Sequence, residues 1–242
     1  MADDVWLIDS GPSEEMRLPL PTRAVLVRLG NGATWLYAPA RFTDALRDEI
    51  DAIGPLRHIV APTATHLEPL PDWLHAYPEA QFWATEPGAK RAGSLSSARY
   101  LKADRAEAAW EDDLRQLVVQ GNPSHPEAVF FHRASDTLIL ADLISAVETA
   151  HLSPWLRPVV WLMGLDDAVG RMPRRVRRGV RDEQAFADSL ERIINWGPRR
   201  ILLRHGRWYR RDGVGELERA FRKILRERQW DKALQKMQDD AR

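Results

Sequence analysis

Three polar residues in this sequence each come at or just beyond the end of an apolar stretch of strand length. They are His66, Asp142 and His205. In layered α/β proteins, ligand sites gather at the carboxyl ends of strands, where loops leave the sheet. Two imidazoles and one carboxylate are suitable ligands for a single zinc or iron ion. The three residues are therefore the candidate metal ligands of the chain.

Each candidate ligand also has a structural interpretation. A histidine after a strand is commonly a hydrogen-bonded structural residue, and Asp142 precedes residues 143–145, where it could cap a helix. Three nearby residues are accessory candidates, namely His125, His132 and Glu68. His132 lies inside an apolar strand, which favours a buried and hydrogen-bonded role. Glu68 could act as a substitute metal ligand, or it could interact with the dipole at the start of a helix.

Other kinds of catalytic site find no support in the sequence. Cysteine is absent, which excludes disulfides, thiolate nucleophiles and cysteine-bound zinc. Ser124 and His125 are adjacent, but no G-x-S-x-G elbow presents a serine nucleophile. No Walker or dinucleotide glycine pattern occurs, and Gly30 and Gly32 lie in a predicted hairpin turn. His, Asp and Glu are the remaining plausible metal ligands.

A segment rich in arginine covers residues 171–181, where six of eleven residues are arginine. Guanidinium groups match the geometry of phosphate, so the segment is a candidate for binding nucleic acid or a phosphate ligand. The apolar and aromatic residues 155–162 before it make contact with a membrane surface a second possibility. In a third interpretation, the arginines form a solvated face and pair with the acidic residues at 166–167 and 182–183. The candidate anion-binding residues are Arg174, Arg175, Arg177 and Arg178.

The bulk composition is that of a globular protein. The chain has 242 residues, 44% hydrophobic and 29% charged, and is long enough to bury a substantial core. Its 35 basic and 35 acidic residues cancel, so no global field draws it to nucleic acid or to an anionic membrane. No run approaches the roughly 20 apolar residues needed to cross a bilayer. The acidic start does not resemble a signal peptide, and together these features predict a cytoplasmic protein.

Short apolar runs alternate with helical patterns along the chain. Runs rich in β-branched and aromatic residues predict strands, and apolar residues spaced by three or four predict helices. Thr43 and Gly54 mark the expected start and end of the first helix. Residues 86–112 are polar and mixed, and are expected to be irregular with short helical pieces. Strands are expected at residues 5–8, 23–28, 34–37, 57–61, 81–84, 114–119, 128–132, 137–140 and 200–204, and helices at 44–53, 72–77, 153–165, 183–196 and 214–230.

The order of the elements predicts sheets covered by helices in layers. No internal repeat, low-complexity tract or Gly/Ser linker divides the chain, which favours a single domain over residues 1–242. Four tryptophans have apolar neighbours on predicted helices and are expected to pack in the core. They are Trp73, Trp155, Trp161 and Trp196.

The element order and the placement of the candidate ligands resemble the metallo-β-lactamase fold. The resemblance implies an α/β architecture, a four-layer αββα sandwich of two mixed sheets, with metals held at one edge. The first signature of that superfamily, H-x-H-x-D-H, places its last histidine on His66 when residues 67–71 are aligned with I-G-G-L-P. The other three ligand positions then fall on Ala61, Thr63 and Thr65, none of which is a good ligand.

The later motifs of the superfamily are partly present. The second hairpin places Asp142 on the metal-bridging aspartate. The histidine expected before this hairpin falls on or near Pro123, two residues from His125. The closing strand and Gly-His-Gly motif match LLRHG, which places His205 on the last ligand. With His66, three of the seven ligand positions are filled.

Within the superfamily, the sequence more closely resembles an uncharacterised group known as a domain of unknown function. In that group, the His-Gly pair is usually followed by Asp and the loop histidine is often followed by a second histidine. This sequence has Arg207 and Leu67 there, and both departures remove potential ligands. The matching strings are PTR at 21–23, RHIVAPTATH at 57–66, EAVFFHRASDTLILADLI at 127–144 and LLRHG at 202–206.

The depleted motif favours a metallo-β-lactamase-like protein with a degenerate metal site and no hydrolase activity, which acts as a binding or scaffolding module. The alternative is a hydrolase in which His66, Asp142 and His205 hold one zinc or iron ion. Its bound hydroxide would attack a small ester, lactone or phosphoester. The cofactor is therefore either none or one divalent metal. Nucleic-acid or phosphate-ligand binding through residues 171–181 is a further alternative.

Overall fold

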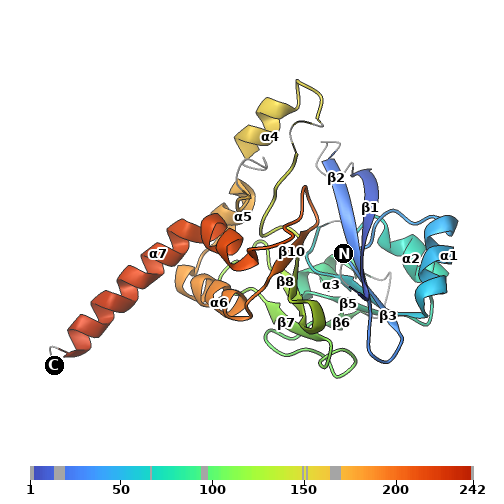
Figure 1. Cartoon of the computed structure of the whole chain (residues 1–242), viewed down its shortest axis with the longest axis horizontal. Coiled ribbons are helices and arrows are strands. Elements are labelled where there is room, and N and C mark those ends of the chain that lie inside the picture. The colour runs from blue at the N-terminus through green and yellow to red at the C-terminus, as the bar shows by residue number, and fades with distance from the viewer. Residues whose placement is uncertain are drawn as a thin grey trace.

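In the computed structural model of the chain, two β-sheets pack face to face and helices cover their outer faces (Figure 1). The structure describes residues 3–13, 20–65, 67–93, 98–148, 150, 152–163 and 170–240.

The first sheet has the strand order β1-β2-β3-β4-β5-β6. β1 to β3 pair antiparallel, and β3 to β6 pair parallel, so the sheet is mixed. Gly32, with φ of +83°, forms part of the turn between β2 and β3. The strands are β1 (Val5–Ser13), β2 (Leu20–Arg28), β3 (Thr34–Tyr37), β4 (Leu56–Ala61), β5 (Gln81–Ala84) and β6 (Arg99–Tyr100).

The second sheet has the strand order β10-β9-β8-β7 and is also mixed. β7, β8 and β9 form an antiparallel meander, whereas β10 pairs parallel to β9. The turn between β8 and β9 closes at Asp136, whose φ of +50° is the left-handed conformation that Asp tolerates. The strands are β7 (Leu114–Val118), β8 (Ala128–His132), β9 (Thr137–Leu140) and β10 (Arg200–Leu203).

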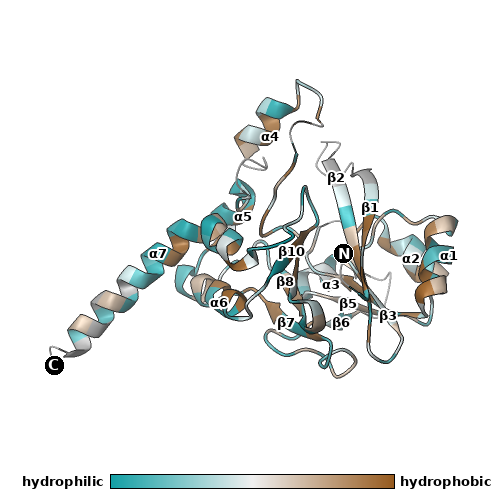
Figure 2. Ribbon diagram, in the orientation of Figure 1, coloured by the Kyte–Doolittle hydropathy of each residue, from teal (hydrophilic) through white to brown (hydrophobic). Residues whose placement is uncertain are grey.

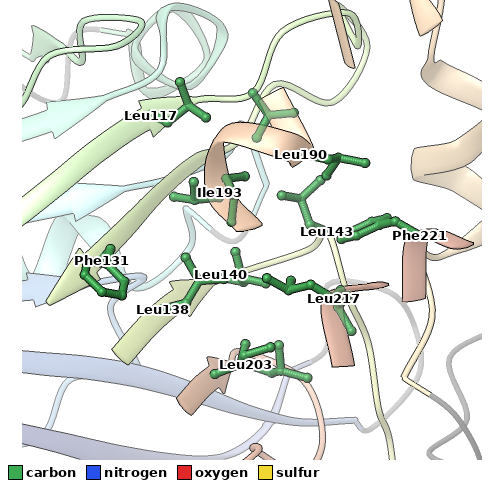
Figure 3. Packing of buried hydrophobic residues seen from close by; sticks show 14 of the residues in the cluster. Leu117, Phe131, Leu138, Leu140, Leu143, Leu190, Ile193, Leu203, Leu217 and Phe221 are labelled. Atoms are coloured by element: carbon green, nitrogen blue, oxygen red, sulfur yellow. The ribbon is translucent and has the colours of Figure 1, made fainter. Parts of the chain in front are cut away.

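Helices cover the outer face of each sheet. α1, α2 and α3 pack on the first sheet through Ile50, Trp73 and Ala89. α6 and α7 pack on the second sheet, where Leu190 and Phe221 belong to one buried cluster with strand residues such as Leu138 and Leu203 (Figure 3). The helices are α1 (Asp44–Ile53), α2 (Leu70–Ala76), α3 (Glu86–Ala92), α4 (Arg157–Met163), α5 (Arg174–Gly179), α6 (Glu183–Asn195) and α7 (Gly213–Asp240).

An aromatic core lies between the two sheets. Trp35 and Tyr37 of β3 stack with ring centroids 5.7 Å apart, and Phe130 of β8 meets Trp35 edge-on at 4.7 Å. Trp110 closes the same cluster. Side chains of a strand alternate between its two faces, so β2 sends Val25 and its alternate neighbours to this core and the residues between them to the helices. The four layers expected from the resemblance are therefore confirmed.

Several expected elements differ from the structure. The segment 86–112 contains α3, which agrees with the short helical pieces expected there, but also the short strand β6, which was not expected. The expected last helix continues to Asp240 as α7, which projects from the body (Figure 1). Trp73 is buried as expected, but Trp155 and Trp161 are each 67% exposed. α4 buries Val160 and leaves the ring of Trp161 in solvent, and Trp155 just before α4 is equally exposed, so the expected core role is wrong for both. Within the described ranges, no helix is both long and apolar enough to cross a membrane.

Candidate functional site

Asp142 and His205 meet at the carboxyl ends of neighbouring strands. β9 and β10 run parallel with Leu140 opposite Leu203, and each candidate lies two residues beyond its strand. His205 Nε2 is 3.5 Å from Asp142 Oδ1, and the two residues are only 5% and 4% exposed. The structure thus brings together two of the three predicted ligands. The third, His66, lies outside the described residues.

Tight backbone packing fixes His205 in this position. Gly206 has φ of +89°, and a Cβ there would collide with the carbonyl oxygen of Ala146. The Arg23 side chain donates to the carbonyl of Gly206, and Arg204 Nη1 donates to the carbonyl of Ala38 at 3.0 Å. The R-H-G string is therefore a structural requirement at this corner as well as a possible ligand motif.

A guanidinium group lies against the Asp142 carboxylate. Arg175 Nη2 is 2.9 Å from Asp142 Oδ2, and the side chain of Arg175 is 28% exposed. Thr65 Oγ1 donates to the same oxygen at 3.1 Å, and Thr63 Oγ1 lies 2.9 Å from Thr65 Oγ1. Asp142 is thus neutralised by a side chain of the protein, and two threonines stand where the superfamily motif has a ligand pair.

A second buried carboxyl, Glu127, holds the loop that carries Asp142. Glu127 Oε1 accepts from the backbone N–H of Ala141 at 2.7 Å, and Oε2 accepts from that of Asp142 at 2.8 Å. Burial raises the pKa of Glu127 to about 8, and the negative charge of Asp142 adds to the rise. Glu127 therefore positions Asp142 and takes up a proton more readily than an exposed glutamate.

The loop after β7 fastens α5 beside the site. Asn122 Nδ2 donates to the Val176 carbonyl at 2.8 Å, and Asn122 Oδ1 accepts from the backbone N–H of His125 at 3.1 Å. Gly179 allows this approach, since a Cβ there would lie 2.9 Å from His125 Nδ1. Burial, followed by the charge of Arg175, lowers the pKa of His125 and favours its neutral form. The packing of α5 thus aims Arg175 at the site.

His132, another accessory candidate, lies away from Asp142. His132 pairs with Thr137 at the opposite end of the β8–β9 hairpin, and its Nδ1 is 2.8 Å from Ser135 Oγ. It has the buried, hydrogen-bonded role that its apolar strand favours and takes no part in the site. Glu68 is exposed just before α2.

The arginine segment divides between the site and the solvent. Only Arg175 turns toward Asp142, whereas Arg174, Arg177 and Arg178 are exposed on α5. Asp182, an expected partner of these arginines, caps α6 by accepting from the Ala185 N–H at 2.9 Å. The residues at 166–167 lie outside the described part of the chain. Among the residues that the structure describes, Asp182 serves as this cap and forms no ion pair with the exposed arginines.

The donor set does not suit the two-metal centre that the fold family implies. Within the part of the chain that the structure describes, no group of three or more His, Asp or Glu side chains is placed to hold a metal ion. Asp142 faces a guanidinium, and the aligned ligand positions are occupied by Ala61, Thr63 and Thr65. A divalent ion about 4 Å from a guanidinium is repelled by about 8 kcal/mol at an effective dielectric constant of about 20. The residues present therefore fit a metal poorly.

Two residues of the site were not expected from the sequence. The sequence predicts Arg175 only as part of an anion-binding surface, since its ion pair with Asp142 depends on how α5 docks. One sequence feature could have indicated a role for Glu127, because it is a charged residue directly before the apolar and fully buried strand β8. A charged residue at such a position needs hydrogen-bond partners.

Comparisons with known proteins agree with this architecture. By sequence, residues 2–157 match the family DUF4336, a domain of unknown function, and no curated protein matches. The solved metallo-β-lactamase of Pontibacter korlensis is similar, with a TM-score of 0.61 and 13% identity over 89% of this chain and 94% of that one. The metallo-β-lactamase FIM-1 of Pseudomonas aeruginosa in its mono-zinc form is also similar, with a TM-score of 0.60 and 14% identity over 94% of this chain and 93% of that one. The chain therefore belongs to the DUF4336 family and has the metallo-β-lactamase fold.

Proposed function

We propose that this protein is a binding module for a small molecule that works without a metal ion, and that it is not a hydrolase. The observation that carries the proposal is the ion pair between Arg175 and Asp142, with Nη2 and Oδ2 2.9 Å apart. The aspartate that aligns with the metal-bridging position has its negative charge balanced by the protein itself. A cytoplasmic location, which the absence of cysteine favours, and a single domain over residues 1–242 are parts of the same proposal.

The electrostatics of the cluster support this function. A metal-bound hydroxide requires a cation to lower the pKa of water, and a guanidinium cannot coordinate water as a Lewis acid. Arg175 can instead donate hydrogen bonds to a ligand carboxylate, phosphate or carbonyl, since its side chain is partly exposed. Thr65 and His205 border the same carboxylate and offer further polar contacts.

Metal analysis of protein purified without an affinity tag tests the proposal. We expect less than about 0.1 equivalent of zinc or iron, unchanged in His205→Ala and Asp142→Asn. We also expect no metal-dependent turnover on a panel of esters, lactones and phosphoesters. Stoichiometric metal that is lost in either variant, or turnover abolished by a chelator and restored by zinc, would overturn the proposal.

A second candidate function is a single-metal hydrolase of an ester, lactone or phosphoester. The close approach of His205 Nε2 to Asp142 Oδ1 favours it, because two of the proposed ligands already face each other. His66 would complete the set, with two imidazoles and one carboxylate. Arg175 would then have to leave Asp142. Zinc binding that becomes tighter in Arg175→Met than in the wild type, and is lost in His66→Ala, would favour this candidate over the metal-free module.

A further inference from the structure

A groove of about 630 Å³ runs between α5 and α7, apart from the Asp142 site. Its apolar floor includes Met172, Phe221 and Ile224. Arg171 and Arg177 line it from the arginine segment, and α7 contributes further basic residues. Those on α7 are Arg219, Arg222, Lys223 and Arg226, and the one acidic residue among the lining side chains is Glu227.

Two of the basic side chains of the groove are already neutralised. Arg219 pairs with Asp212 and Glu216, each at 2.8 Å, and Lys223 lies 3.7 Å from Glu227. The four others make no ion pair with any described residue. They are Arg171, Arg177, Arg222 and Arg226, and all are exposed.

The two walls of the groove are anchored by the core of the second sheet. Leu217 and Phe221 of α7 pack beside Leu143 and Leu190 (Figure 3), and Val176 of α5 belongs to the same cluster. These contacts turn the polar faces of α5 and α7 outward, where both helices are mostly hydrophilic (Figure 2). Three of the four guanidinium groups are thus presented by fixed helices, and the backbone of Arg171 is held by a β-bridge to Ser145. Such fixed positions limit the entropy lost when the side chains bind a ligand.

We propose that this groove binds the phosphodiester backbone of a single-stranded nucleic acid. The four positively charged guanidinium groups around this groove repel each other, and binding a row of negatively charged phosphates relieves that repulsion. Guanidinium forks also match phosphate oxygens in geometry. Arg174 and Arg178 extend the basic surface along α5 beyond the groove, as a strand longer than one nucleotide requires.

The placement of the apolar residues favours nucleic acid over a lipid surface. Three exposed tryptophan rings could enter a bilayer, and none of them lines the groove: Trp155 lies just before α4, Trp161 lies on α4, and Trp230 lies on α7 one turn beyond Arg226. The arginines instead lie on two walls of a concave surface, which suits a strand lying in the groove. A flat or convex basic face would suit a membrane better.

Fluorescence anisotropy with a labelled twelve-nucleotide single strand tests the proposal as a function of salt concentration. Four phosphate contacts predict that log K falls against log salt with a slope of about −2.8, at about 0.7 per contact. The double variant Arg222→Gln, Arg226→Gln should reduce the slope to about −1.4 and weaken binding at least tenfold at low salt. Glu227→Gln removes the acidic residue of the groove and should tighten binding.

The matched control removes two exposed arginines outside the groove, Arg41→Gln with Arg105→Gln, and should leave affinity and slope nearly unchanged. A slope near zero, or equal loss in the control and the groove variant, would overturn the proposal. Binding to vesicles with anionic lipid but not to the strand would also overturn it, in favour of a membrane surface. Because none of the substituted residues contacts Asp142, these outcomes are independent of the metal content measured for the proposed function.

Discussion

Replacing Arg175 with methionine removes the positive charge beside Asp142 and keeps a side chain of similar length. Asp142 is only 4% exposed, so its carboxylate would lose its guanidinium partner in a nearly dry environment. Breaking a buried ion pair costs about 3–5 kcal/mol. Arg175 is 28% exposed, so water can replace part of the interaction, and the lower end, about 3 kcal/mol, is expected. For a chain of this size, that corresponds to a fall in Tm of about 6–12 °C.

Thermal unfolding followed by circular dichroism at neutral pH measures this effect in a double-mutant cycle. Asp142→Asn removes the charge that Arg175 neutralises, so the double variant should be more stable than Arg175→Met alone. Lys90→Met, which breaks an ion pair with Glu86 in which both side chains are exposed, is the control and should change Tm little. A fall of less than about 2 °C for Arg175→Met, or a double variant no more stable than it, would refute the idea that the ion pair holds the site.

Three other predictions concern the neighbours of the site. Because burial raises the pKa of Glu127 to about 8, above its ordinary 4.5, the folded state binds more protons than the unfolded state between these values. The free energy of unfolding should therefore fall as pH rises through this window. Thermal melts of Glu127→Gln at the same pH values should lack this pH-dependent loss of stability. Gly206→Ala should lower stability by about 3 kcal/mol or more in denaturant unfolding, because its Cβ would meet the Ala146 carbonyl in a left-handed backbone. Asn122→Ala leaves the Val176 carbonyl without its donor and should cost about 1–3 kcal/mol, with faster amide hydrogen exchange in α5.

Much of the fold is predicted correctly wherever the signal is local. α1 begins and ends where Thr43 and Gly54 predict, since the Thr43 side chain accepts the N–H of Leu46 at 3.2 Å. The strands of the β8–β9 hairpin have the expected bounds. Two apolar runs form the strands, and Asp136, which tolerates a positive φ, forms the turn between them. Such features depend on residues close together in the chain, so no tertiary contact has to be known.

The elements that were missed depend on distant contacts. α5 has no apolar periodicity that could have predicted it, because only Val176 and Gly179 of its six residues are buried. Its position comes from Asn122 and from the core of the second sheet. Trp155 and Trp161 likewise show a helical, apolar neighbourhood, but the burial of a ring depends on whether another element lies over it.

The candidate ligands show the same division. That most of the metal-ligand motif is missing can be read without the structure, because Ala61, Thr63 and Thr65 are identified by alignment alone. The sequence also places Asp142 beyond a strand end, where site residues gather. The ion pair between Arg175 and Asp142 could not be predicted in this way, since that contact requires α5 to dock at the carboxyl end of β9. The physical reason is that an ion pair depends on a few ångströms of distance between segments, which the packing of helices sets and residue spacing does not.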